Sequence, residues 1–141
     1  MPKKSKAQWL IDLLNEVDGY IDDKELAKIL EKRGRTCVGP NYIKKAKDAA
    51  RNTKSIDDFV KKLSKTLPML KKEGDKVYMV YPKCYCHHIK GLEGDIPKSY
   101  CYCSIGWVKE LFEQALNKPI NVKLESSILG GDKTCRLRVA L

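Results

Sequence analysis

Long hydrophobic runs are missing from this chain. Its 141 residues are 43% hydrophobic, but no apolar stretch approaches the roughly 18 residues that a membrane-spanning helix needs. The lysine-rich start continues into apolar residues, yet Asp12 and Glu16 interrupt it and no small-residue cleavage site follows. The segment therefore predicts an amphipathic helix rather than a signal peptide. We expect a cytoplasmic protein that does not enter a membrane.

Arginine is also scarce. The chain carries 28 basic and 18 acidic residues, a formal net charge of +10, but only five of the basic residues are arginines. Base edges and phosphates are recognised best by the arginine guanidinium, so a lysine-rich chain indicates a solvated surface. We do not expect nucleic acid as the partner. A basic helix face with Lys44, Lys47, Arg51 and Lys54 leaves a nucleic-acid-binding module as an alternative.

Internal repeats and low-complexity tracts are absent, and the first half of the chain shows helical periodicity instead. Apolar residues recur at spacings of three and four in four segments, which predicts four short helices. Asp22 or Asp23 caps the second helix and Gly34 stops it, while Ser55 caps the fourth. The expected helices cover residues 5–17, 22–34, 41–52 and 55–67.

The composition changes at the turn signal Glu73-Gly74-Asp75. The residues that follow are rich in β-branched and aromatic side chains, which predicts a strand. An amphipathic helix capped by Ser104 comes next. Two segments in which apolar and polar residues alternate then predict an antiparallel hairpin, with Cys135 on its buried side. The fold class is therefore α+β, with N-terminal helices packed with a C-terminal antiparallel sheet and one amphipathic helix. We expect a helical segment, 1–72, and a Cys-rich segment, 73–141, that form one compact unit.

Cysteine is concentrated in one stretch. Four of the six cysteines form two Cys-x-Cys pairs, Cys84/Cys86 and Cys101/Cys103, with His87 and His88 between them. In a reducing compartment such thiols are metal ligands, free or redox-active thiols, or catalytic groups. Zinc takes four ligands, often thiolates, although a one-residue spacer is less specific than Cys-x-x-Cys. Zinc, with iron as an alternative, and a cysteine nucleophile therefore both stay open.

The C-terminal third carries a more specific pattern. Cys101 is followed five residues on by Gly106, a helix ends at Asn117-Lys118, and Gly131-Asp132-Lys133-Thr134-Cys135-Arg136 comes last. In this order and without a gap, these residues resemble the 4-vinyl reductase domain, a small-molecule-binding α+β module of bacterial and archaeal sensors.

The resemblance implies a structural zinc beside a pocket for a small apolar or aromatic molecule. It puts Cys101 and Cys135 on metal-ligand positions, but a further cysteine of the family pattern is Ser127 here, and serine is a poor zinc ligand. We therefore expect Cys84 and Cys86 to complete the site, with Cys103 as the alternate ligand. The expected pocket lining is aromatic: Tyr81, Tyr85, Tyr100, Tyr102, Trp107 and Phe112.

The whole chain, including the Gly34-Arg35-x-Cys37 element, is also similar to uncharacterised prokaryotic proteins related to L-2-amino-thiazoline-4-carboxylate hydrolases. That similarity implies an alternative function, a cysteine- or metal-dependent hydrolase of a small amide or thiazoline. No residue of the sequence secures catalysis, so we expect a small-molecule-binding or sensor-type domain with a structural Cys-ligated metal. A homodimer is compatible with this expectation.

Overall fold

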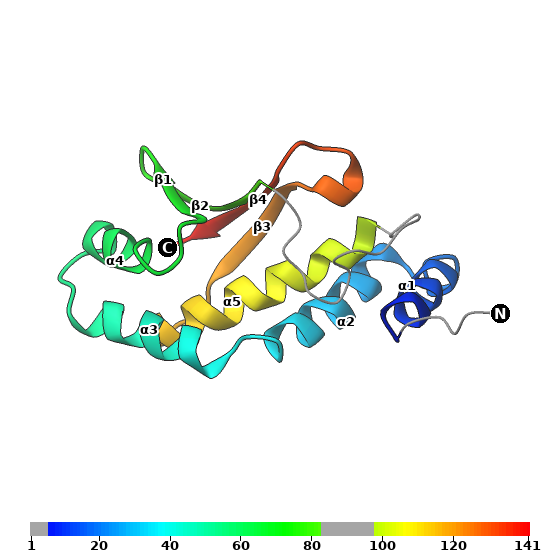
Figure 1. Ribbon diagram of the computed structural model, residues 1–141, viewed down its shortest axis with the longest axis horizontal. Helices are drawn as coiled ribbons and strands as arrows, with labels where there is room; N and C mark the ends of the chain where they lie inside the picture. The colour runs from blue at the N-terminus through cyan, green and yellow to red at the C-terminus, as the bar shows by residue number, and fades with distance from the viewer. Residues whose placement is uncertain (1–5, 83–97) are drawn as a thin grey trace.

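The computed structural model describes residues 6–82 and 98–141 (Figure 1). Its five helices and four strands confirm the α+β class. No helix in these two ranges is both long and apolar enough to span a membrane. The elements are α1 (Lys6–Val17), α2 (Asp23–Arg35), α3 (Pro40–Arg51), α4 (Ile56–Leu63), β1 (Leu70–Glu73), β2 (Lys76–Tyr81), η1 (Lys98–Cys101), α5 (Tyr102–Leu116), β3 (Asn121–Ser126), η2 (Ile128–Gly130) and β4 (Cys135–Ala140).

Two predicted helix caps are confirmed. The Asp22 carboxylate accepts a hydrogen bond of 2.9 Å from the Lys24 backbone N–H, and Ser55 Oγ accepts one of 3.1 Å from that of Asp58. The predicted cap of α5 was wrong, because the 3-10 turn η1 runs directly into this helix and makes Cys101 its N-cap, without a side-chain cap bond. Ser104 therefore lies inside the first turn of α5.

The four strands form one antiparallel sheet in the order β1-β2-β4-β3. The predicted hairpin of β3 and β4 is confirmed, with a register shift between Leu124 and Ser126. The short strand β1 was not predicted; it turns back into β2 through Gly74, whose φ of 63° is one that glycine adopts readily. The helices gather on one side of this sheet (Figure 1).

A single large core joins both halves of the chain. Fully buried residues from α4, β2, α5 and β4 pack in it, and the rings of Phe59 and Phe112 meet edge to face with centroids 6.1 Å apart. A smaller apolar cluster joins α1 and α2 to Tyr100 of η1. Residues of the expected 1–72 and 73–141 segments therefore share one core.

Ion pairs fix α5 against α2. The Arg35 guanidinium contacts the Glu113 carboxylate through two nitrogens, at 3.1 and 3.2 Å, and Glu110 at 3.3 Å, while Lys109 contacts Glu31 at 2.6 Å. Burial raises the pKa of Glu113, but the hydrogen bonds from Arg35 and from the Ile120 backbone N–H outweigh it and hold that pKa below its ordinary value. These contacts hold the C-terminal half of α5 against α2.

Candidate functional site

Three side chains from separate elements meet where β4 begins. Cys101 ends η1, Ser127 precedes η2, and Cys135 is the first residue of β4. Ser127 Oγ donates a buried hydrogen bond of 2.9 Å to Cys101 Sγ, and the Ile128 backbone N–H donates one of 3.3 Å to Cys135 Sγ. Two thiols that are distant in the sequence therefore lie in one hydrogen-bonded group.

The connection between β3 and β4 holds Ser127 in place. The Ser127 backbone N–H donates to the Asp132 carboxylate at 2.9 Å, and the Asp132 N–H donates back to the Ser127 carbonyl at 3.0 Å. Gly131 has a φ of 99°, which allows the chain to close this turn. The Gly-Asp pair of the sequence pattern thus has a local structural role, which the sequence argument did not identify.

The pKa values of the two thiols are shifted in opposite directions. The hydrogen bond from the Cys101 thiol lowers the pKa of Cys135 to about 6, against an opposing effect of burial, and the Ile128 N–H lowers it further. The same hydrogen bond, together with burial, raises the pKa of Cys101. The pair therefore favours a thiolate on Cys135 and a thiol on Cys101.

Tyr81 lies directly beside this pair. It is the cross-strand partner of Cys135 in the register of β2 and β4. Burial, and then the negative charge of Cys135, raise the pKa of its phenol, so Tyr81 stays protonated. Cys135 also shares a sheet face with buried Leu137 and Val139, as the sequence alternation predicted.

The remaining cysteines lie apart from the pair or outside the described residues. Cys103 is partly buried against the smaller apolar cluster, and Cys37 is exposed after α2. Cys84 and Cys86 fall in 83–97, which the structure does not describe, as does Tyr85. In the described ranges no group of three or more His, Cys, Asp or Glu side chains could hold a metal ion.

These donors fit one half of a tetrahedral thiolate site. Cys101 and Cys135 offer two soft sulfur atoms, and one of them is already favoured as the thiolate that zinc requires. Ser127 occupies the adjoining position with a hydroxyl, which binds zinc poorly. Two further ligands would have to come from outside 6–82 and 98–141.

The aromatic residues expected to line a pocket are distributed over several places. Phe112 is fully buried in the main core, and Trp107 packs edge to face against Tyr42 with ring centroids 5.6 Å apart. Tyr100 is buried in the smaller cluster, against which Tyr102 packs. Packing of α5 between the sheet and α2 separates these rings.

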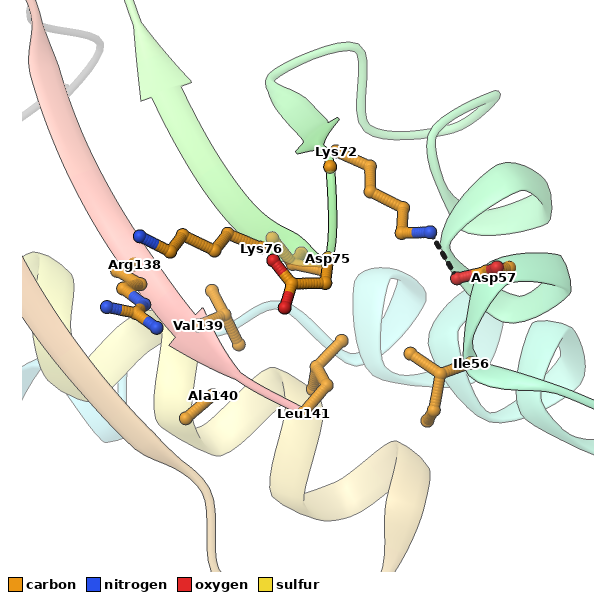
Figure 2. Close-up of a pocket in the computed structure, with 11 residues that line it drawn as sticks. Ile56, Asp57, Lys72, Asp75, Lys76, Arg138, Val139, Ala140 and Leu141 are labelled. Atoms are coloured by element: carbon orange, nitrogen blue, oxygen red, sulfur yellow. Dashed lines mark ion pairs between the residues drawn. The ribbon is translucent and has the colours of Figure 1, made fainter.

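A cavity of about 560 Å³ lies at the opposite end of β2 and β4 from Cys135. Figure 2 shows Lys72 and Asp57 forming an ion pair across one side, and the side chains of Lys76 and Arg138 extending toward one another on the other side. No motif marked this cavity, because its walls come from three separated segments of the chain, 56–57, 72–77 and 138–141. It is lined by Ile56, Asp57, Lys72, Gly74, Asp75, Lys76, Val77, Arg138, Val139, Ala140 and Leu141.

Comparison with known proteins identifies a family. A family of unknown function, DUF6144, matches residues 1–141, so the chain belongs to that family. No curated protein and no solved structure matches the chain.

Proposed function

We propose that this DUF6144 member is a small-molecule-binding or sensor-type domain with a structural metal site, in which Cys101 and Cys135 supply two ligands and Cys84 and Cys86 the others. The proposal rests on one observation: the Cys101 and Cys135 thiols lie in a single hydrogen-bonded group, with a thiolate favoured on Cys135. Four thiolates favour zinc over the harder divalent ions, which prefer oxygen ligands.

The length of the chain permits the other two ligands to reach the pair. Tyr81 is the cross-strand partner of Cys135, and Cys84 follows Tyr81 by three positions in the sequence. A chain spans at most about 3.3–3.6 Å per residue, so three residues cover about 10 Å. The positions of Cys84 and Cys86 in the sequence therefore support their assignment as ligands.

A bound metal would supply cross-linking rather than reactivity. Cys101 is the N-cap of α5, and Cys135 is the first residue of β4. A metal held by both residues would join the helical layer to the sheet, and in such sites the free energy of binding becomes free energy of folding.

The cavity at the other end of β4 supports the small-molecule part of the proposal. Its volume lies in the range of about 300–1,000 Å³ that is typical of ligand pockets. Val77, Val139 and Leu141 give it apolar walls, and charged side chains surround them. We propose this cavity, in place of the dispersed aromatic rings, as the ligand site.

Metal analysis tests the site directly. Protein purified without added metal should contain about one zinc per chain, and Cys101→Ser and Cys135→Ser should each lose the metal and lower Tm. Cys37→Ser is the matched control, because Cys37 is exposed and lies after α2; it should keep both metal and Tm. A wild-type protein with no zinc or iron, and with all thiols titrating equally before and after chelation, would overturn the proposal.

The hydrolase alternative requires a different coordination. Four thiolate ligands close a zinc site, whereas a catalytic zinc keeps a position open for water. X-ray absorption at the zinc edge distinguishes four sulfur ligands from three protein ligands and an oxygen. The second result would favour the hydrolase.

A further inference from the structure

The sheet face that points away from the core is rich in cations. Met79 and Leu137 are fully buried in the core, and side chains alternate along a strand, so their neighbours Tyr78 and Arg138 project from the opposite face. Lys71, Lys76, Lys123 and Arg138 are all exposed there. None of these four cations has an ion-pair partner within the described part of the chain.

Strand register aligns three of these cations in one row. Lys71 of β1 pairs with Tyr78 of β2, Tyr78 pairs with Arg138 of β4, and Arg138 pairs with Lys123 of β3. Neighbouring strands are about 4.8 Å apart, so the row crosses about 14 Å of sheet. We call this row and its central Tyr78 the cationic row.

The two acidic residues within the strands already contact a cation on this face. Glu73 forms an ion pair with Arg136, and Glu125 lies 3.9 Å from the same guanidinium. Arg136 in turn lies over the ring of Tyr78, 3.9 Å from its centroid. The acids therefore contact Arg136 rather than the cations of the row, and the Arg136 guanidinium is a planar group that covers the buried ring of Tyr78.

We propose that the cationic row binds single-stranded nucleic acid, with backbone phosphates on Lys71, Arg138 and Lys123. Open sheet faces bind single strands by combining cations for the backbone with planar groups on which bases stack. Arg136 on Tyr78 is such a planar group. This activity is independent of the metal site and lies on a different face from the basic side of α3.

Two other polyanions fit this face less well. Reading duplex DNA requires a helix or ribbon that enters a groove, whereas the cationic row lies across the surface of a four-stranded sheet. An anionic membrane is bound best by cations combined with apolar side chains that insert. The large exposed apolar residues of the described chain lie outside the strands: Trp9, Leu13, Tyr20, Ile29, Tyr42 and Ile56.

Fluorescence anisotropy with labelled single-stranded RNA and DNA of about a dozen nucleotides tests the proposal. At about 50 mM salt the wild type should bind, and the logarithm of the binding constant should fall with the logarithm of salt concentration with a slope of about −2, as three phosphate contacts predict. The triple variant Lys71→Gln, Lys123→Gln, Arg138→Gln should bind at least about tenfold more weakly.

The matched control variant also removes three positive charges, but from α3 and the residues just after it: Lys44→Gln, Lys47→Gln, Lys54→Gln. These lysines are exposed, and this variant should stay within about twofold of the wild type, because it leaves the row intact. Equal Tm values show that both variants are folded. No binding by the wild type, equal losses in the two variants, or preferential binding of duplex DNA or phosphatidylserine vesicles would overturn the proposal.

Discussion

Gly106 of α5 lies against the backbone of Glu31 in α2: a Cβ on Gly106 would stand 1.8 Å from the Glu31 carbonyl oxygen. Gly34 makes the reciprocal contact, because its Cβ would stand 1.8 Å from the carbonyl oxygen of Cys103. The two helices thus touch through their backbones. This contact gives Gly106, five residues after Cys101, a structural role: only a residue without a side chain fits where α5 meets α2.

Alanine at either glycine should therefore be strongly destabilising. A backbone carbonyl cannot rotate away as a side chain can, so Gly106→Ala and Gly34→Ala must separate the helices, at a cost of about 3 kcal/mol or more. Gly19→Ala is the control, because its Cβ would meet the nearest atom, the Glu16 carbonyl oxygen, at an ordinary 3.6 Å. Urea unfolding measures all three. Equal small losses would show that α2 and α5 do not cross this closely.

Gly34 also shows why the contact between α2 and α5 could not be predicted from the sequence. We predicted it as the stop of the second helix, but α2 continues through Arg35 and is capped by Thr36. A glycine that ends a helix and one that admits a neighbouring backbone have the same sequence signal. Only the position of α5, which no local pattern encodes, distinguishes them.

The periodic elements were predictable because their signals are local. The helices appear with shifted ends, and the caps at Asp22 and Ser55 depend on residues within one turn. Strand β1 was missed, because the sequence Leu70-Lys71-Lys72-Glu73 has one apolar residue and no alternation. Its existence depends on pairing with β2.

The candidate site, too, could be predicted from the sequence only in part. Alternation predicted the face of Cys135, and the ordered pattern of the C-terminal third selected Cys101 and Cys135, which the structure brings together. The hydrogen bonds from Ser127 and from the Ile128 N–H follow from the turn before β4, which spacing alone does not define. The cationic row depends on the register of four strands. The amino-acid composition shows the excess of lysine but not this arrangement.

The Arg35–Glu113 pair should make stability depend on pH. The pKa of Glu113 lies below its ordinary value in the folded state, so its contribution is present above the unfolded-state pKa of about 4.3 and is lost as pH falls through the folded-state pKa. Glu113→Gln should cost about 1–2 kcal/mol at pH 7 and progressively less in acid. Urea unfolding across this pH range checks the trend.

The control for this pair is Glu25→Gln. Glu25 pairs with Lys28 at 3.5 Å on the exposed surface of α2, and such pairs contribute about 0–1 kcal/mol. A difference between Glu113→Gln and the wild type that stays constant from neutral to acid pH would contradict the ionic role of Glu113.

Phe112 should act in folding rather than in ligand binding. It is fully buried, with its ring edge to face against Phe59. Phe112→Leu and Phe59→Leu should each cost about 1–2 kcal/mol, and the double variant should cost less than their sum by about 0.5–1.5 kcal/mol, the usual energy of such a ring pair. Tyr20→Leu, at a residue 85% exposed, is the neutral control. Strictly additive losses would exclude the ring contact.

Ser127 offers the sharpest test of the metal site. It is 2% exposed, and its Oγ lies 2.9 Å from Cys101 Sγ, so Ser127→Cys would add a third sulfur beside the pair with little change in volume. Cys84→Ser alone should weaken zinc binding by about a hundredfold or more. Adding Ser127→Cys to it should restore most of the affinity, measured by competition with a chelator, because the new thiolate replaces the missing ligand. Adding Ser127→Ala, which removes the hydroxyl without supplying a donor, should restore nothing. Loss of two free thiols without zinc binding in the Ser127→Cys protein would show that the new cysteine forms a disulfide with Cys101 or Cys135, and would contradict a metal at this position.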